Sequence, residues 1–109
     1  MKKFEVVLLE EAFKFLQSLE LKHRGKILQN IRRAQIDNDS SLFKKLTGDI
    51  WEFRTLYAGI QYRLLAFWDK RDKENTLVLA THGFIKKTSK VSKKEMNKAE
   101  SIRKEYFRK

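Results

Sequence analysis

Two arginines lie where a β-hairpin would bring them together. Arg54 and Arg63 flank the pair Ala58-Gly59. If the chain reverses symmetrically at that pair, residues whose numbers sum to 117 face each other, and Arg54 lies opposite Arg63. Like charges directly opposite destabilise a sheet, whereas two facing guanidinium groups make a bidentate site for a phosphate. The alternative is that Glu52 neutralises one arginine in an ordinary surface charge cluster.

The pairing depends on the length of the loop. Ala58 is not a preferred residue of a two-residue primed turn, and a three-residue loop would shift the register by one and separate the arginines. Side chains alternate along a strand. We therefore expect Trp51 and Phe53 on the core face, and Glu52 and Arg54 on the other face.

Further groups that transfer protons or hold anions flank the hairpin. His82, near the end of a later strand, is either a proton donor or acceptor or a buried structural residue. A lysine within a cationic cluster can have its pKa lowered towards neutrality and act as a base. The lysines nearest these strands are Lys44, Lys45, Lys86 and Lys87.

The elements that must position these side chains predict an α+β fold in the order β-α-α-β-β-β-α. Residues 4–9 are apolar on both faces, which predicts a central, buried strand. Apolar stripes at helical spacing predict two antiparallel helices joined near residues 19–22, the second ending by residues 37–40. Aromatic and β-branched runs predict three further strands, at residues 50–56, 60–68 and 76–81.

A basic connection precedes the last predicted helix. Ser92 and Glu95 match a capping box at its start, and its apolar stripe contains Met96, Ala99, Ile102 and Tyr106. We expect the helices to cover one face of a small, mostly antiparallel sheet. The other face would then be free to bind a ligand.

Composition narrows the class of protein. The 109 residues contain no proline, repeat or linker, which predicts a single domain at residues 1–109. The absence of cysteine excludes disulfides, thiolate metal sites and a cysteine nucleophile. No apolar run is long enough for a membrane span. We expect a cytoplasmic protein with no membrane partner, no metal and no cofactor.

Most of the excess positive charge lies in the last quarter of the chain. The net charge is +11, and residues 85–109 contain 10 Lys or Arg against 3 Asp or Glu. Such a patch attracts polyanions through counterion release, which favours a nucleic-acid partner. An acidic protein partner and a merely solubilising helix face are the alternatives.

Three segments together carry a family resemblance. They are residues 45–54 (KLTGDIWEFR), 62–63 (YR) and 81–88 (THGFIKKT). In their order and spacing they resemble the phage-derived, HigB-like branch of the RelE toxin superfamily.

The resemblance implies the toxin of a type II toxin–antitoxin system, with a RelE-like fold. Such a toxin is a metal-independent endoribonuclease that cuts mRNA in the 30S decoding site of the translating ribosome. The ribose 2′-hydroxyl attacks the neighbouring phosphate and leaves a cyclic phosphate. The implied partner is a helix-turn-helix antitoxin of the HigA type.

We expect Arg54 and Arg63 to clamp the phosphate and the transition state. Lys86 and Lys87 would transfer protons or bind substrate, and His82 would be a general acid. The backbone of mRNA or ribosomal RNA would be held by Lys44, Lys45 and Lys90.

The sequence departs from the superfamily pattern at two places. Glu52 stands where better-known members have a lysine, and residues 94–96 replace a tyrosine of the closing segment. The acid–base roles therefore do not carry over. Glu52 is either a base or a residue that orients Arg54, and Tyr62 is the one tyrosine among the motifs, an accessory candidate. A catalytically weakened RNA- or ribosome-binding protein, and a basic module acting mainly through its antitoxin, are the alternative functions.

Overall fold

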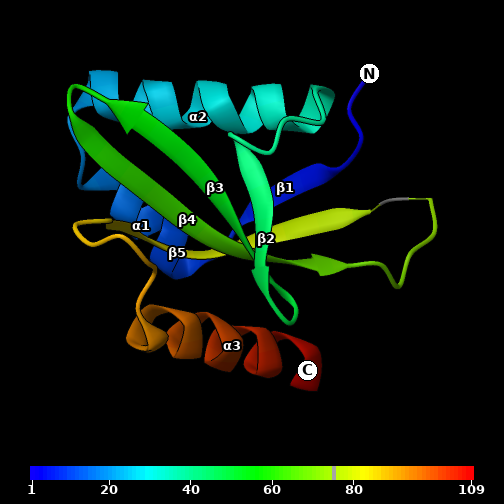
Figure 1. Ribbon diagram of the computed structural model, residues 1–109. Coiled ribbons are helices and arrows are strands. Elements are labelled where there is room, and N and C mark those ends of the chain that lie inside the picture. The colour runs from blue at the N-terminus through cyan, green and yellow to red at the C-terminus, as the bar shows by residue number, and fades with distance from the viewer. Residues whose placement is uncertain (75) are drawn as a thin grey trace.

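The fold is a five-stranded sheet with helices on both faces (Figure 1). The computed structural model describes residues 1–74 and 76–109. The strands lie in the order β1-β5-β4-β3-β2, antiparallel except that β1 is parallel to β5. This confirms the α+β class and the mostly antiparallel sheet. The elements are β1 (Glu5–Leu8), α1 (Glu10–Gln17), α2 (Leu21–Ile36), β2 (Phe43–Thr47), β3 (Ile50–Tyr57), β4 (Ile60–Asp69), β5 (Leu77–Ile85) and α3 (Lys93–Arg108).

Two predictions about the strands are wrong. The first strand is not central, because β5 lies between β1 and the rest of the sheet and leaves β1 at an edge. The strand β2 was not predicted, because its residues (FKKLT) carry two consecutive lysines and lack an alternating apolar pattern. This additional strand places Lys44 and Lys45 on the sheet itself rather than on a preceding loop.

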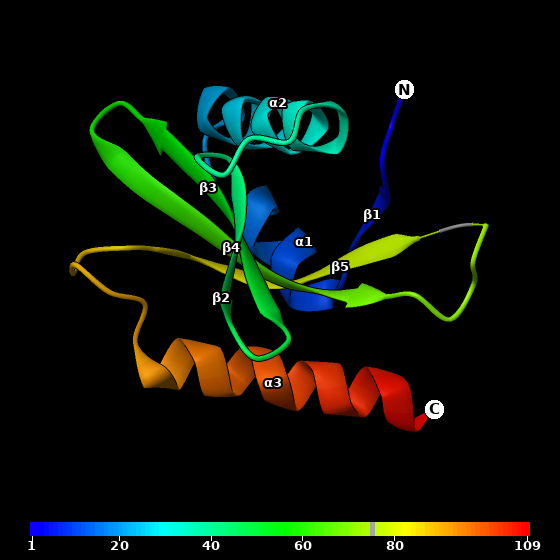
Figure 2. The ribbon, with the colours of Figure 1, turned by 45° about the vertical axis from the view of Figure 1, so that its right-hand side comes forward.

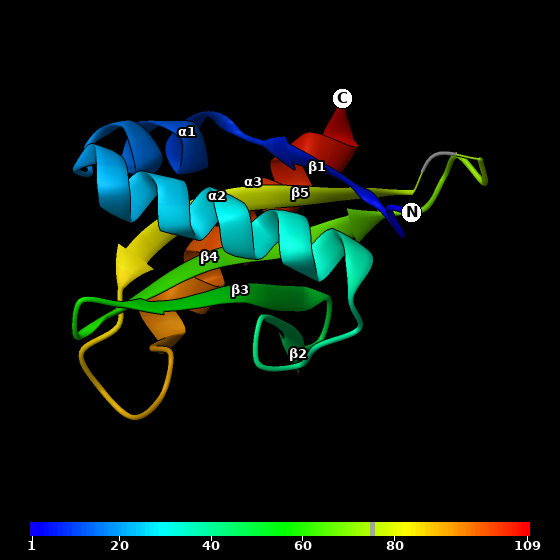
Figure 3. The same ribbon diagram turned by 90° about the horizontal axis from the view of Figure 1, so that it is seen from above.

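The helices lie on both faces of the sheet, so the prediction of one helical layer is also wrong. In Figures 2 and 3, α1 and α2 lie on one side of the sheet and α3 lies on the other. The α1–α2 face holds the main core, which includes Leu16, Ile27 and Phe53. The α3 face holds a smaller cluster around Leu65 and Ala99. Apolar side chains alternate onto both faces of the central strands, so each face must be covered. None of the described helices is long and apolar enough to span a bilayer.

The β3–β4 hairpin has the predicted two-residue turn. Arg54 pairs with Arg63 across the two strands, which confirms the predicted register. Ala58 has φ of 52° and Gly59 has φ of 76°, the pair of positive values that a type I′ turn requires. Ala58 therefore adopts a left-handed conformation that an L side chain disfavours.

The C-terminal half of α3 is fastened to the end of β4. The buried carboxylate of Asp69 accepts hydrogen bonds from the hydroxyl of Tyr106 (2.7 Å) and from the guanidinium of Arg71 (2.8 and 3.0 Å). The ring of Phe67 packs against Tyr106 and Phe107, with centroids 5.3 and 5.5 Å apart. The hydrogen bonds from Arg71, and then that from Tyr106, hold the pKa of Asp69 well below its usual range.

The turn predicts opposite effects for two substitutions. Ala58→Asn should raise the free energy of unfolding by about 1 kcal/mol, because asparagine tolerates positive φ better than alanine. Gly59→Ala should lower it by a similar amount through backbone strain alone, because a Cβ there meets no atom within 4 Å. Urea unfolding measures both changes. Equal stabilities for the two variants would contradict the type I′ assignment.

The Asp69 contacts predict a pH-dependent contribution of α3 to stability. Asp69→Asn should lower the free energy of unfolding at pH 7 by about 1–3 kcal/mol, the worth of hydrogen bonds to a charged group. Because the pKa of Asp69 is lower in the folded state, the charged carboxylate stabilises the fold at pH values above its unfolded-state pKa of roughly 3.9. This contribution is lost as the pH falls from there through the folded-state pKa. The difference between wild type and variant should therefore shrink below about pH 4 in thermal unfolding. A difference that stays constant down to pH 2 would refute this role.

Candidate functional site

Five charged side chains from four strand segments gather at one end of the α3 face. Cross-strand pairs place Lys44 beside Glu52 and Arg54 beside Arg63. Lys86 follows β5, and its backbone N–H donates to the carbonyl of Gln61 at 2.8 Å. We call this group, Lys44, Glu52, Arg54, Arg63 and Lys86, the basic cluster. Its four cations and one carboxylate leave a local excess of positive charge.

Glu52 lies between the two arginines. Its Oε1 is 3.2 Å from Nε of Arg63, and its Oε2 is 3.7 Å from Nε of Arg54. Neither contact has hydrogen-bond geometry, so Oε1 and both Nε atoms lack a hydrogen-bonding partner within the described residues. The contacts are therefore electrostatic. Two guanidinium groups converge on one buried carboxylate, and the neutralisation of an arginine by Glu52, considered from the sequence, is present in the structure.

The two arginines differ in their access to solvent. Arg63 is 3% exposed and donates to the carbonyl of Tyr62 and to Oε1 of Gln61, both at 2.9 Å. The side chain of Arg54 is 30% exposed. Burial is the main cause that lowers the pKa of Arg63 from its ordinary value. Arg54 can meet an incoming phosphate directly, whereas Arg63 is held mainly by protein acceptors.

Lys86 has the electrostatic surroundings of a candidate base. Its pKa is lowered, first by burial and then by the positive charges of Arg63, Arg54 and Lys44, while Glu52 acts in the opposite direction. An amine with a lowered pKa is neutral in a larger fraction of molecules at neutral pH. It can then accept a proton, which a guanidinium cannot.

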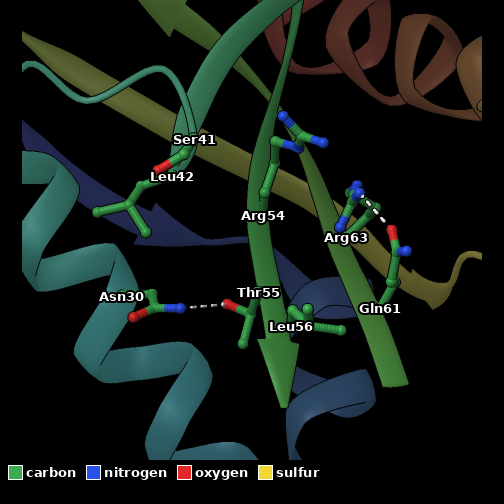
Figure 4. Close-up of a pocket in the computed structure, with 8 residues that line it drawn as sticks. All are labelled: Asn30, Ser41, Leu42, Arg54, Thr55, Leu56, Gln61 and Arg63. Atoms are coloured by element: carbon green, nitrogen blue, oxygen red, sulfur yellow. Dashed lines mark hydrogen bonds between the residues drawn. The ribbon is translucent and has the colours of Figure 1, made fainter. Parts of the chain in front are cut away.

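A cavity of about 380 Å³ opens beside the basic cluster (Figure 4). It lies where the chain before β2 separates from β3. The last contact between them is the hydrogen bond from the backbone N–H of Arg54 to the carbonyl of Leu42, at 2.8 Å. The opposite wall contains a hydrogen bond from Nδ2 of Asn30 to Oγ1 of Thr55, at 3.1 Å. The volume is in the range of small-ligand sites. Its lining residues are Asn30, Ser41, Leu42, Arg54, Thr55, Leu56, Gln61 and Arg63.

His82 lies outside the basic cluster, beneath the start of α3. It is 2% exposed, its Nδ1 is 3.0 Å from Oγ1 of Thr81, and its Nε2 is 2.9 Å from a carboxylate oxygen of Glu95. Burial lowers the pKa of His82, although Glu95 acts in the opposite direction. Glu95 also completes the cap of α3, because its backbone N–H donates to Oγ of Ser92. The histidine thus ties the first turn of α3 to the sheet.

Tyr62 lies on the α1–α2 face, opposite the basic cluster. Its side chain is buried and its hydroxyl is 2.7 Å from Nδ1 of His23. Gly83, from the segment at residues 81–88, also lies against the α1–α2 face. A Cβ there would clash with the ring of Phe15 and with Leu64. The tyrosine and the glycine therefore support the packing of the helices.

The remaining lysine candidates are spread around the cluster rather than within it. Lys45 pairs with Trp51 and lines a different cavity. Lys87 and Lys90 are exposed on the connection between β5 and α3. Among the described residues, no three His, Asp or Glu side chains are grouped so that they could hold a metal ion.

Two site residues were missed from the sequence. Gln61 holds Arg63, and its position two residues before Arg63 on the same strand was a usable signal, because alternate residues share a face. Asn30 reaches the cavity from α2 and had no signal, because its helix lies far from the motifs in the sequence.

The shared carboxylate predicts that Glu52→Gln destabilises the fold. The neutral amide would leave a buried guanidinium without its counter-charge, which should lower the free energy of unfolding by about 3 kcal/mol. The matched control is Glu10→Gln, which removes the exposed partner of Lys14 and should leave the stability nearly unchanged, because solvent screens this ion pair. Urea unfolding of both variants measures the difference. Equal stabilities would show that Glu52 does not neutralise Arg63.

Comparison with known proteins places the chain in a family. Residues 14–104 match the sequence model of a family described as "Phage derived protein Gp49-like (DUF891)". This family is a RelE/HigB-like toxin family. No curated protein matches the chain significantly. Because the match extends over most of the 109 residues, the chain belongs to the phage-derived Gp49-like family of toxins.

Proposed function

We propose that the protein is a metal-independent endoribonuclease, the toxin of a type II toxin–antitoxin system, which cuts mRNA on the ribosome. The basic cluster carries this proposal. It combines a partly exposed arginine, a lysine with a lowered pKa and an adjoining cavity of about 380 Å³. Cleavage of RNA by its own 2′-hydroxyl needs a base and a cation at the phosphate.

In the proposed reaction, neutral Lys86 removes the proton of the ribose 2′-hydroxyl. The 2′-oxygen bonds to phosphorus, the bond from phosphorus to the 5′-oxygen breaks, and the leaving 5′-oxygen takes a proton from solvent water, to which Lys86 returns the proton that it removed. The products are a 2′,3′-cyclic phosphate and a 5′-hydroxyl. Arg54 donates to the phosphoryl oxygens, on which negative charge develops in the transition state. Lys44 adds positive charge on the same face.

Arg63 and Glu52 act as positioning residues in this proposal. Glu52 contacts both arginines and holds Arg54 beside the cavity. Of the two roles left open for Glu52, orientation has the stronger support, because its carboxylate is buried between guanidinium groups. The hydrogen bonds from Arg63 to Tyr62 and Gln61 keep that arginine in place.

The proposed partners follow from the charge and the family. With a net charge of +11, the protein would be attracted to ribosomal RNA, and the exposed Lys87 and Lys90 extend the basic cluster towards a bound polyanion. We propose that a HigA-like helix-turn-helix antitoxin blocks the cluster, and that the toxin works in the cytoplasm as a HigB-like member of its family.

A second candidate is an RNA- or ribosome-binding protein of the same fold with weakened catalysis. It is favoured by Glu52, which stands where better-known relatives have a lysine, and by Arg63, which is occupied by protein acceptors. Such a protein would bind RNA with strong salt dependence and leave it intact.

The proposal predicts unequal effects of the two arginines. Arg54→Ala should slow cleavage of ribosome-bound mRNA by about 10²–10³-fold, the usual effect of losing one transition-state donor. Arg63→Lys should cause a smaller loss. Mapping of mRNA 5′ ends and growth after induction measure both, with the exposed Lys104→Ala as control. No cuts by the wild-type protein would favour the second candidate, and full activity of Arg54→Ala would refute the site.

The role of Lys86 predicts a pH profile. A base must be deprotonated, so single-turnover cleavage should rise with pH and level off below the ordinary lysine pKa of roughly 10.4. Lys86→Arg should reduce the rate by at least about 10²-fold and remove this step, because arginine stays protonated. An unchanged profile in the variant would assign the base to another group.

A further inference from the structure

Both tryptophans of the chain line a second cavity, away from the basic cluster. Its volume is about 320 Å³, and Trp51 and Trp68 lie in it with their rings 5.6 Å apart at an interplanar angle of 76°. Both side chains are only partly buried. We call this cavity the tryptophan pocket. It is lined by Lys45, Gly48, Asp49, Trp51, Trp68, Lys70 and Arg103.

The tryptophan pocket lies where the β2–β3 turn, the end of β4 and α3 meet. Arg103 of α3 forms an ion pair with Asp49 of the turn at 3.2 Å, and Figure 2 shows this turn next to α3. Trp51 lies three residues before Arg54 on β3 and Trp68 lies five residues beyond Arg63 on β4, so both indoles alternate onto the face of the sheet opposite the arginines. The pocket is therefore spatially distinct from the proposed cleavage site.

The charges of the pocket favour an anion. The negative charge of Asp49 is taken up by Arg103, which also contacts Glu100 at 2.9 Å. Lys45 and Lys70 have no acidic partner within the described residues. Nζ of Lys70 lies 5.0 Å from the ring centroid of Trp68, in a cation–π contact. An exposed contact of this kind is weak enough for a ligand to displace.

We propose that the tryptophan pocket binds one nucleotide of single-stranded RNA, with its base stacked on an indole and its phosphates held by Lys45 and Lys70. Partly exposed aromatic rings beside free cations are the arrangement by which proteins hold single strands without reading sequence. A duplex does not fit, because its bases are stacked inside the helix. As a substrate-holding site, the pocket rests on the proposed function. It would grip the mRNA at a distance from the scissile phosphate.

The position of the tryptophans makes the test direct. Because the chain has no other tryptophan, its indole fluorescence reports on the surroundings of Trp51 and Trp68, which line this pocket and a smaller cavity beside Phe43. A short 2′-O-methyl oligoadenylate, which has no 2′-hydroxyl to attack, should quench the emission saturably. Lys45→Ala/Lys70→Ala should weaken binding at least tenfold. It should also lower the slope of log affinity against log salt by about 1.4, since a single strand contributes about 0.7 per phosphate contact.

Controls separate this site from the basic cluster and from other ligands. Lys22→Ala/Lys104→Ala removes two exposed helical lysines and should leave the quenching unchanged. Arg54→Ala should slow cleavage by about 10²–10³-fold yet retain the quenching, and quenching by a wild-type protein that cuts no mRNA would overturn the proposed function alone. Inorganic polyphosphate, which has no base, should not quench. Absence of quenching, equal quenching in the Lys45/Lys70 variant, or stronger saturable quenching by polyglutamate would overturn the proposal.

Discussion

The contact of one carboxylate with two arginines organises the open part of the α3 face. Without Glu52, the pairing of Arg54 with Arg63 would place two guanidinium groups opposite each other with nothing between them, and like charges in that position destabilise a sheet. Glu52 lies two residues before Arg54 on the same face and reaches both. The single negative charge of Glu52 offsets one of the two arginine charges, and one positive charge remains. The sheet can thus keep an excess cation at a half-exposed position, which is the condition for meeting a phosphate.

The location of α3 determines which part of that face remains open. Its first turn is joined to β5 through Glu95 and His82, and its last turns are joined to β4 through Tyr106 and Asp69. The helix therefore covers the apolar side chains of this face, such as Leu65, and leaves Arg54 of the basic cluster partly exposed. The same helix supplies Arg103 to the tryptophan pocket.

The sequence predicted the parts that depend on local pattern. The alternation of Glu52 and Arg54 against Trp51 and Phe53, the turn at Ala58-Gly59 and the cap at Ser92 each follow from neighbouring residues, and the structure has all three. The edge position of β1, the strand β2 and the side on which α3 packs depend on contacts between distant segments, and these were not predictable from the pattern. The same reason explains why the places of His82 and Tyr62 outside the basic cluster were not predictable. Their motif positions were clear, but burial beneath α3 and against His23 is a tertiary property.

The charge distribution and the short-range chemistry of the two sites together favour RNA as the ligand. A protein with a net charge of +11 attracts any polyanion, so charge alone does not distinguish a substrate from a ribosome or an acidic partner. What distinguishes them is the chemistry at short range. At the basic cluster a lysine with a lowered pKa stands beside an arginine and a cavity, which suits the reaction of a ribose with its own phosphate. At the tryptophan pocket flat rings stand beside lysines with no acidic partner among the described residues, which suits holding a base and its phosphates without reacting with them. A single strand that reaches both sites would be bound at one and cut at the other, so affinity and turnover would be separable properties of this small domain.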